Sequence, residues 1–552
     1  MLNQLLNVLV FWEMLFIKRF FLQPFIKQTQ MPGTVQDELL RQILSKNQNT
    51  RFGKEHNFGS IKSRDQFVKA VPIQNWEDLR PYIEEQETQK TPALTAERPV
   101  MYCQTSGTTG SPKNIPILKS SLERLKRSQA IFSLGLYEKI PGIFSGKILA
   151  IHGAVIEGRL ASGAPYGSMS GLIGESMPFS LKSKYAVPRQ VFDIADYNLK
   201  YLLIAAYALR EKDITFFASA NPTTFLKLLE VIKNNFASLL QFMKTGEPSR
   251  LPGAANRNIN FLKGFTINSE RIGEIEGLMK LRDDLTLAML WPNLRGLATW
   301  TGGNCSLVLP KLRAIIPESA RVIELGYIAS EFRGGLTVDP IDNTCLPTLH
   351  ENFFEFVELD DGDNPSPKTV ALEQIEEGKQ YYVIVTTQHG LYRYFINDII
   401  EAAGKFYDTP AIRFVQKGKG ITNLTGEKLA ESQVIEALKM IRNERQLTFD
   451  FFILFADKDL FQYKLYIEIA PLTGLEKKLE EQLSRLNIEF EAKRKSGRLL
   501  PTDVTFLKEG CGDAYKADQI ARGQRESQFK LARLQYNTDC QFNFSPFMHP
   551  AP

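Results

Sequence analysis

Residues 104–117 read Gln-Thr-Ser-Gly-Thr-Thr-Gly-Ser-Pro-Lys-Asn-Ile-Pro-Ile, and this stretch contributes most to the prediction of the fold. From Thr105 to Ser111 it contains only hydroxyl residues and glycines, and Lys113 follows. Glycines let a backbone approach a ligand closely, hydroxyl and amide groups donate to phosphate oxygens, and a lysine supplies positive charge. The stretch therefore predicts a polyphosphate-binding loop, although an ordinary flexible loop can have the same composition.

Two common nucleotide-binding patterns do not describe this loop. The P-loop requires GxxxxGK[ST], and the dinucleotide-binding loop requires GxGxxG. Neither spacing occurs between Gln104 and Ile117. A Walker-type NTPase and a Rossmann oxidoreductase are therefore disfavoured.

Length and composition indicate a multidomain globular protein. The chain has 552 residues, of which 43% are hydrophobic and 23% are charged. This length exceeds what one hydrophobic core supports, so two or three packed units are expected. The formal net charge of +5 is small and forms no dense basic stripe. It fits an anionic ligand such as a nucleotide, and no nucleic-acid partner is predicted.

Cysteines and histidines indicate the compartment and argue against a zinc site. The five cysteines are dispersed without a CxxC pair, and the five histidines lack metal-ligand spacing. Dispersed cysteines of odd number favour reduced thiols and a cytoplasmic location. The histidine pattern makes a zinc site improbable.

Residues 5–22 are apolar enough to be compared with a signal peptide or a membrane helix. Glu13, Lys18 and Arg19 interrupt this segment, no basic residue precedes it, and no small-residue cleavage site follows it. We therefore predict a helix packed on the domain surface rather than a transmembrane segment. Peripheral membrane contact through the Phe, Leu and Trp side chains of residues 5–22 is the alternative.

Hydrophobic periodicity indicates an α/β architecture. Short buried strands are predicted to alternate with helices over several hundred residues, which is typical of a sheet covered by helices. The strands are expected at residues 147–152 and 215–218, and the helices at 36–46, 122–134, 198–211 and 224–237.

A second series of elements predicts a separate C-terminal unit. Strands at 353–359 and 380–386 precede residues 416–423, which are polar and glycine-bearing, as a hinge would be. The alternation then restarts and gives a unit of about 130 residues, an ordinary domain size. Its helices are expected at 429–442 and 475–486, and its strands at 448–456, 462–469 and 503–508.

The loop at residues 104–117 resembles the phosphate loop of acyl-adenylate-forming enzymes. In detail, the chain is similar to the auxin-responsive-promoter (Gretchen Hagen) family of acyl-acid amido synthetases. The similarity runs from Asn47-Gln-Asn-Thr-Arg-Phe-Gly53 through Val71-Pro-Ile73 to the C-terminal segment. By this resemblance, the residues predicted to bind ATP in the loop are Ser106, Gly107, Thr108, Thr109 and Lys113.

Gly326-Tyr-Ile-Ala-Ser-Glu331 resembles the Tyr-Ala-Ser-Ser-Glu motif of this family. The resemblance implies that Tyr327 lies at the adenine pocket, that Ser330 contacts phosphate, and that Glu331 helps to hold Mg²⁺. A single carboxylate suits Mg²⁺ that bridges phosphates, because this ion usually keeps several waters. Upstream, Trp300-Thr-Gly-Gly303 resembles a segment beside the acyl and adenine pockets.

Gly390-Leu-Tyr-Arg-Tyr-Phe-Ile-Asn-Asp398 resembles a family pattern that ends in Gly-Asp. The resemblance implies that Asp398 accepts both ribose hydroxyls of ATP, a task that suits a carboxylate because it accepts two hydrogen bonds at once. Asn397 replaces the family's glycine, and Phe395 stands where arginine is frequent. Asparagine tolerates left-handed backbone angles, so the turn is expected to survive.

Two C-terminal strings complete the resemblance. Asn423-Leu-Thr-Gly-Glu-Lys-Leu429 resembles the motif that follows the hinge in microbial and animal members, and it adds Lys428 to the predicted ATP-binding residues. Ser527-Gln-Phe-Lys-Leu-Ala-Arg533 resembles Gln-x-Lys-x-Pro-Arg, with alanine in place of proline. Lys530 thus matches the lysine that enters the site during adenylation, and it is predicted to be catalytic together with Glu331. Gln416-Lys417 departs from the Gly-Arg pair that is usual in the hinge.

The resemblance implies an ATP- and Mg²⁺-dependent ligase. Such an enzyme adenylates a carboxylic acid and transfers the acyl group to an amino acid or another amine. The implied fold is a large adenylate-forming domain with a smaller, mobile α+β C-terminal domain. The predicted boundaries are 1–30 for an N-terminal helical segment on the main domain, 31–415 for the ATP- and acyl-binding domain, 416–423 for the hinge, and 424–552 for the C-terminal domain.

Two other functions fit the same residues. An acyl-CoA ligase uses the same adenylation step with a thiol acceptor, but the Thr-Gly-Glu-Lys and Gln-Phe-Lys strings favour the amido synthetase. A nucleotide-binding relative that has lost catalysis would explain the departures from the family motifs. Retention of Glu331, Asp398 and Lys530 opposes that interpretation. The acyl pocket is expected around residues 152–169 and 290–307.

Overall fold

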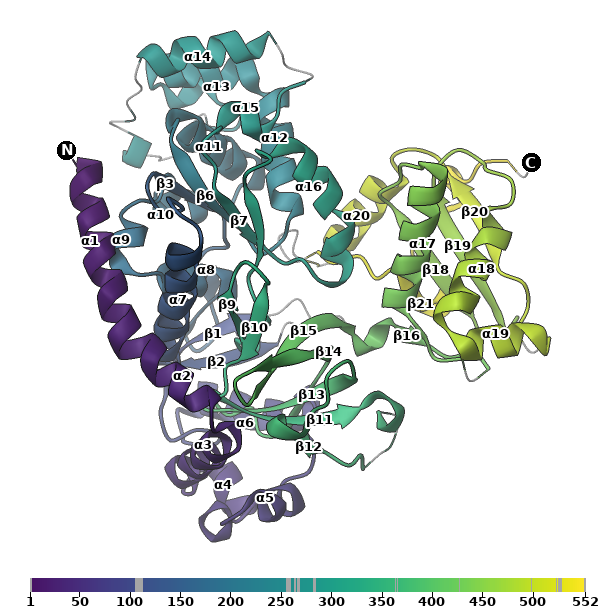
Figure 1. Cartoon of the computed structure of the whole chain (residues 1–552). Coiled ribbons are helices and arrows are strands. Elements are labelled where there is room, and N and C mark those ends of the chain that lie inside the picture. Colours follow the sequence, from purple (N-terminus) through teal and green to yellow (C-terminus); the bar gives the residue numbers. More distant parts are fainter. Residues whose placement is uncertain are drawn as a thin grey trace.

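The computed structural model describes residues 2–104, 113–254, 260–262, 265, 269–280, 284–362, 364, 366–425, 427–497, 499–522, 524 and 529–550. Helices and sheets alternate in a large N-terminal part, and a smaller C-terminal unit stands beside it (Figure 1). The predicted α/β class, with covered sheets and a smaller C-terminal unit, is confirmed.

One predicted helix differs in extent from the observed elements. Residues 224–237 form two helices, α12 (Thr223–Asn234) and α13 (Phe236–Thr245), instead of one. Asn235 separates them, and its Nδ2 donates to the main-chain oxygen of Val231 at 3.0 Å. Asparagine side chains that bond the nearby backbone compete with helix continuation, which accounts for the break.

A parallel sheet with the order β3-β6-β7-β8 forms the centre of the large part. Both faces are covered by helices, so its strands read as continuous apolar runs. Phe217 packs with the helices of one face, whereas its neighbour Phe216 packs with those of the other. The strands are β3 (Lys147–Ala150), β6 (Ile214–Ala218), β7 (Gly296–Thr299) and β8 (Arg321–Glu324). The first face carries α10 (Arg189–Phe192), α11 (Tyr197–Arg210), α12, α13, α14 (Ser269–Met279), α15 (Leu287–Leu290) and α16 (Leu309–Ile315), and the second carries α1 (Leu2–Ile17), α7 (Lys119–Lys139) and α9 (Phe179–Lys182).

Two further sheets share the largest hydrophobic core. The five-stranded antiparallel sheet has the order β12-β11-β13-β14-β15, and the other sheet has the order β2-β1-β5-β4. The first contains β11 (Asn352–Glu358), β12 (Val370–Ala371), β13 (Gln380–Thr387), β14 (Tyr394–Phe406) and β15 (Thr409–Lys417). The second contains β1 (Pro99–Gln104), β2 (Asn114–Leu118), β4 (Gly158–Arg159) and β5 (Pro165–Gly167).

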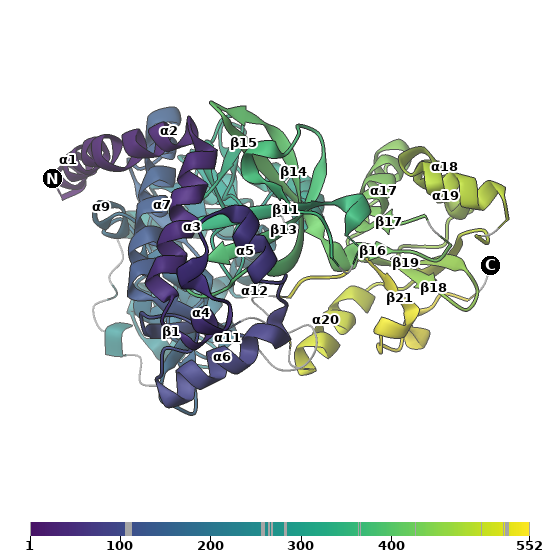
Figure 2. The ribbon, with the colours of Figure 1, turned by 90° about the horizontal axis from the view of Figure 1, so that it is seen from below.

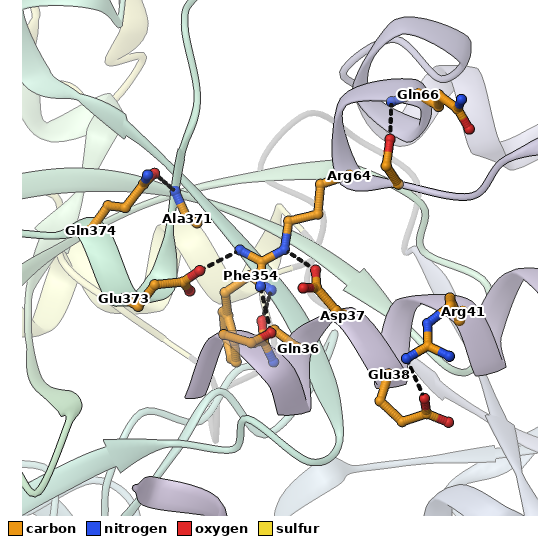
Figure 3. Close-up of polar contacts among 12 residues, drawn as sticks. Gln36, Asp37, Glu38, Arg41, Arg64, Gln66, Phe354, Ala371, Glu373 and Gln374 are labelled. Carbon is orange, nitrogen blue, oxygen red and sulfur yellow. Dashed lines mark hydrogen bonds and ion pairs between the residues drawn. The ribbon is translucent and has the colours of Figure 1, made fainter. Parts of the chain in front are cut away.

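Helix α3 (Pro32–Asn47) is tied to the five-stranded sheet by polar contacts that the close-up displays (Figure 3). The buried Gln36 amide donates to two main-chain oxygens, those of Leu349 and Asn352, and accepts from the Phe354 N–H at 2.8 Å. Arg64 joins Asp37 of the helix to Glu373, which follows β12. These contacts fix segments that lie more than 300 residues apart in the sequence.

Shorter elements connect the layers and position the site. Helix α6 (Trp76–Gln89) begins with a capping box, in which Asn75 Oδ1 accepts from the Glu77 and Asp78 N–H groups and Asp78 accepts from the Asn75 N–H. This cap satisfies backbone donors at the helix start. The other connecting elements are α4 (Arg51–Glu55), α5 (Arg64–Ala70), α8 (Met169–Glu175), β9 (Gly335–Asp339), β10 (Thr344–Pro347), β16 (Ile421–Thr422) and β17 (Leu429–Ala430).

The C-terminal unit has its own sheet, with the order β20-β19-β18-β21. Phe452 of the central strand faces one helical layer and Phe451 faces the opposite side, so both faces are covered. Figures 1 and 2 show this unit beside the large part, joined where β15 leads to β16. Its strands are β18 (Phe452–Asp457), β19 (Gln462–Glu468), β20 (Asp503–Leu507) and β21 (Leu534–Tyr536), and its helices are α17 (Glu431–Arg445), α18 (Leu475–Leu486), α19 (Ile488–Lys495) and α20 (Cys511–Ala521).

The N-terminal segment is helical and lies on the surface of the large part (Figure 1). Helix α1 continues through a π-helical turn (Lys18–Leu22) into α2 (Gln23–Thr29). Val10, Met14 and Ile17 are buried against the core beneath α1. Of the helices in the described ranges, none has both the length and the apolar character that crossing a membrane requires.

We expect Arg393→Ala to destabilise the large part strongly. Its guanidinium donates to both carboxylate oxygens of Glu355 at 2.9 Å, and the two side chains are only 4% and 5% exposed. Removing one partner of a buried pair leaves an uncompensated charge, which costs about 3–5 kcal/mol. Urea unfolding measures the loss. The control is Arg413→Ala, which breaks an exposed pair with Glu401 and should cost less than about 1 kcal/mol. Equal losses in both variants would contradict this expectation.

Candidate functional site

A cleft of about 3000 Å³ lies between the large part and the C-terminal unit and is lined by residues of both. Predicted site residues from four separate strings line it, although up to several hundred residues separate them in the sequence. The predicted residues that line it are Lys113, Tyr327, Ser330, Glu331, Asp398 and Lys530.

Asp398 is a buried, hydrogen-bonded carboxylate of the cleft. Its side chain is only 3% exposed. Tyr327 Oη donates to Asp398 Oδ2 at 2.8 Å, and Lys417 Nζ donates to Asp398 Oδ1 at 2.7 Å. Burial and the nearby Asp398 carboxylate raise the pKa of Tyr327 well above its usual range, so the phenol stays protonated and donates. The pKa of Lys417 is raised. Partial burial acts to lower it, but the negative charges of Asp398 and Glu331 have the larger effect.

The backbone before Asp398 adopts the conformation that the sequence predicts. Asn397 has a φ of 59°, in the left-handed region that asparagine tolerates better than most residues. Gly418 lies directly against it, because a Cβ at this glycine would stand 2.2 Å from Asn397 Oδ1. The pair fixes β14 next to the end of β15, where Lys417 lies.

Lys113 marks the end of the predicted phosphate loop. Its Nζ donates to Tyr394 Oη at 3.1 Å and lies 5.8 Å from the centre of the Trp76 ring. The strands that flank the loop, β1 and β2, are antiparallel, with Gln104 opposite Asn114. The other predicted loop residues lie outside the described ranges, and they are Ser106, Gly107, Thr108 and Thr109.

Glu331 and Ser330 lie in a tight turn bridged by Ile328 and Arg333. Burial lowers the pKa of His389 to about 4, so its neutral ring donates from Nε2 to the Glu331 main-chain oxygen at 2.9 Å. The Glu331 side chain is half-buried and lines the cleft. The described residues hold no cluster of three metal-ligating side chains. A single carboxylate beside a phosphate site fits Mg²⁺, which takes its other ligands from phosphate oxygens and water.

Lys530 reaches the cleft from the C-terminal unit. Its ammonium lies 4.7 Å from the centre of the Trp300 ring, which belongs to the large part. The side chain is exposed to the cleft, yet protein surrounds it on most sides. This partial desolvation, together with the charge of Lys417, lowers the pKa of Lys530.

Family models match most of the chain. They are the GH3 family N-terminal domain over residues 21–320, the central domain over 345–417 and the C-terminal domain over 431–539. The chain belongs to the GH3 family. This is the auxin-responsive-promoter family that the sequence motifs resemble, and membership confirms the prediction of an ATP-dependent acyl-acid amido synthetase, a ligase that forms amide bonds through an acyl-adenylate.

Relatives of known activity cover nearly the whole chain. Indole-3-acetic acid-amido synthetase GH3.15 of Arabidopsis thaliana is 24% identical, over 92% of this chain and 91% of the relative. The 4-substituted benzoates-glutamate ligase GH3.12 of Arabidopsis thaliana is 23% identical, over 91% and 92%.

Solved structures share the fold. The GH3.15 acyl acid amido synthetase superposes with a TM-score of 0.81 at 22% identity and 96% coverage of both chains. A 2-hydroxyisobutyryl-CoA ligase in complex with its acyl-AMP superposes with a TM-score of 0.53 at 11% identity, covering 93% of this chain and 91% of the ligase. The adenylate-forming fold predicted from the sequence is thereby confirmed.

The GH3 motif that contains the predicted ATP-binding residue Lys428 lies at the start of the C-terminal unit. Lys428 is exposed and is not among the residues that line the cleft. Its neighbour Glu427 is buried instead, where it accepts from the N–H groups of Leu424 and Thr425 and from Tyr463 Oη at 2.6 Å. The left-handed φ of 44° at Lys428 turns its side chain away from that network. The string thus stabilises the start of the C-terminal unit.

Lys417 and Glu324 are charged residues of the GH3 cleft that were not among the predicted site residues. Lys417 was noted only as a departure from the hinge pattern, and its pairing with Asp398 depends on the β14–β15 register, which places the two residues opposite each other. Glu324 accepts from the Thr301 N–H at 2.7 Å and from the Gly326 N–H at 3.0 Å. Burial raises the pKa of Glu324 despite these donors. Its apolar neighbours in β8 gave no signal of a site.

We expect Lys530→Ala to lower acid-dependent ATP–pyrophosphate exchange by about 10²-fold or more, the loss typical of one preorganised donor. Lys495→Ala is the matched control, because this lysine of the same unit is 73% exposed and does not line the cleft, and it should retain wild-type exchange. Exchange that is unchanged in Lys530→Ala would remove Lys530 from the adenylation step.

Proposed function

We propose that this GH3 enzyme adenylates an apolar carboxylic acid in the cleft and transfers the acyl group to an amine, in most cases an amino acid. The observation that carries the proposal is the convergence of Asp398, Glu331 and Lys530 on one cleft, from three distant parts of the chain. A sugar-binding carboxylate, a Mg²⁺-binding carboxylate and a mobile cation are the groups that adenylation with ATP requires.

Asp398 is assigned to the ribose of ATP. Each of its oxygens accepts one hydrogen bond, from Tyr327 or from Lys417. A carboxylate has about four acceptor positions, so two remain for the ribose hydroxyls. Tyr327 and Lys417 are positioning residues in this assignment, because their hydrogen bonds fix the orientation of the carboxylate.

Glu331 is assigned to Mg²⁺, with Ser330 at the phosphates. Mg²⁺ supplies positive charge that neutralises the phosphate oxygens when it is bound. The negative charge of Glu331 influences other groups of the cleft, because it contributes to the raised pKa values of Tyr394 and Lys417. The predicted loop residues Ser106, Gly107, Thr108, Thr109 and Lys113 remain part of the proposed phosphate site.

Lys530 is assigned to charge stabilisation in the first step. The substrate carboxylate attacks the α-phosphorus, a P–O bond forms, and pyrophosphate leaves with the electron pair of the broken bond. Negative charge grows on the phosphoryl oxygens in this transition state, so a fixed cation nearby accelerates it. Lys530 is such a cation, brought to the cleft from the C-terminal unit.

The second step requires the removal of Lys530 and the entry of an amine. The amine attacks the acyl carbon, an amide bond forms, AMP leaves with the electrons of the anhydride bond, and the amine nitrogen loses one proton to solvent. We propose that the C-terminal unit rotates about residues 416–423 between the two steps. The proposal is supported by the position of Lys530, whose ammonium lies over the Trp300 ring of the large part, and by the separate core of the C-terminal unit.

The acid is proposed to be apolar. The cleft extends between α7, β3 and β6, where apolar side chains line it, and this includes part of the segment 152–169 expected from the sequence. Trp300 and Cys305 of the other expected segment, 290–307, also line the cleft, whereas Leu290 at its start is buried in the core. The apolar lining residues are Phe132, Ile148, Met169, Met177, Tyr185 and Phe216.

A cytoplasmic location is proposed for the enzyme. All five cysteines are free thiols. Disulfides form and persist in oxidising compartments, so five unpaired thiols support a reducing one.

The proposal is tested by an acid screen followed by an acceptor screen. With ATP and Mg²⁺, apolar carboxylic acids should drive pyrophosphate exchange, and an amino acid should then yield an amide and AMP. Coenzyme A is the competing acceptor. A thioester formed in preference to any amide would favour an acyl-CoA ligase. Binding of ATP without exchange across a broad acid panel would instead indicate a relative with impaired catalysis.

The lowered pKa of Lys530 predicts the pH dependence of adenylation. The protonated amine is the active form, so exchange should fall as the pH rises through a pKa below that of free lysine. Lys530→Arg keeps its charge to about pH 12, so the alkaline limb of its profile should move upward even if the maximal rate is lower. Profiles of kcat/KM for ATP, taken from about pH 7 to about pH 10, measure the shift. Coincident alkaline limbs would assign that titration to another group.

A further inference from the structure

Helix α1 is apolar on both of its sides, although only one side is covered. Val10, Met14 and Ile17 face the core and are at most 2% exposed. The opposite side presents large apolar side chains to solvent, and Trp12 at its centre is 63% exposed. A helix that is apolar all round is normally buried on all sides. The exposed members of this face are Leu5, Val8, Leu9, Phe11, Trp12, Leu15, Phe16 and Phe20, and we call them the α1 outer face.

The spacing makes this face continuous. Val8, Trp12, Phe16 and Phe20 follow one another at intervals of four residues, which places them on one side of a helix. Phe16 and Phe20 are in ring contact at 4.7 Å. Phe179 of the adjacent helix α9 is 74% exposed and adds another apolar side chain beside α1. In both overall views, α1 lies at the outer edge of the molecule (Figures 1 and 2).

Two polar residues of α1, Asn7 and Glu13, contact the body of the protein. Asn7 Oδ1 accepts from the Lys184 ammonium at 2.6 Å. Glu13 accepts from the N–H groups of Phe179 and Ser180 at 3.1 and 3.0 Å. These contacts orient the helix so that its apolar outer face is directed away from the body.

Basic residues outnumber acidic ones along this face, although Lys18 is paired with Glu138 of α7 at 2.8 Å. Glu13 is the only acidic residue among positions 5–29, and its carboxylate is engaged with α9. Arg19 lies on the same side as Trp12, since seven residues make about two helical turns, and it is exposed. Lys27 is exposed as well. Aromatic side chains flanked by basic ones match the boundary of a bilayer with anionic headgroups.

We propose that the α1 outer face docks this protein on the surface of an anionic lipid bilayer. The helix lies in the plane of the interface, with Trp12, Phe16 and Phe20 among the acyl chains and Arg19 at the lipid phosphates. The apolar acid proposed as substrate partitions into the same bilayer, so docking would bring the enzyme to its substrate. The docking itself rests on α1 alone and is independent of the proposed reaction.

Flotation with lipid vesicles tests the proposal on the full chain. Wild-type protein should float with vesicles of phosphatidylcholine and phosphatidylserine and bind vesicles of phosphatidylcholine alone more weakly. The double variant Trp12→Glu/Phe16→Glu should lose at least tenfold in partitioning. Arg19→Gln should lose about fivefold on anionic vesicles, as expected for one basic residue at such a surface, and little on neutral ones.

Ile488→Glu is the matched control, because Ile488 is 79% exposed on the C-terminal unit, away from α1. It should float like the wild type. Circular dichroism melting confirms that each variant folds, and pyrophosphate exchange without lipid should be unchanged in all of them. Wild-type protein that stays with the soluble fraction would overturn the proposal, as would a double variant that floats equally well. A dimer seen by light scattering and abolished by the double variant, without flotation, would assign the face to a second copy of the chain.

Discussion

The cleft depends on one hydrogen-bonded group, the buried carboxylate of Asp398 held between Tyr327 and Lys417. A carboxylate that is 3% exposed is costly to bury unless it is paired and hydrogen-bonded. The three residues come from the segment after β8, from β14 and from the end of β15. The same contacts that make burial of the charge tolerable therefore fix the relative positions of the elements that form the nucleotide side of the cleft.

The predicted site residues that line the cleft lie in short strings of contiguous sequence. The Gly326–Glu331 and Gly390–Asp398 strings and Lys530 were located, and left-handed Asn397 behaved as its residue type predicts. Lys417 was missed because its partnership with Asp398 is set by strand register, which no local string encodes. Lys428 is a different case. Its string resembles the family motif, but the buried side chain is that of its neighbour Glu427, whereas Lys428 itself is exposed.

The fold was predictable where periodicity is strong. Strands β3 and β6 are buried on both faces, so their apolar runs were recognised. The division of residues 224–237 was not, because it depends on one side-chain contact of Asn235. The buried Arg393–Glu355 pair was equally hidden, because its partners are brought together only by the five-stranded sheet. Charged residues in a sequence do not reveal whether they will be paired in a core.

The central claim is that Asp398 anchors the nucleotide and that Tyr327 acts through it. Calorimetric titration with AMP of the wild type, Asp398→Asn, Tyr327→Phe and the double variant tests this directly. Asp398→Asn keeps the shape of the side chain and should weaken AMP binding about tenfold or more, the cost of hydrogen bonds to a charged group. The double variant should bind only slightly more weakly than Asp398→Asn, because the two residues act as a unit. Wild-type affinity in Asp398→Asn, or fully multiplicative losses in the double variant, would contradict the account.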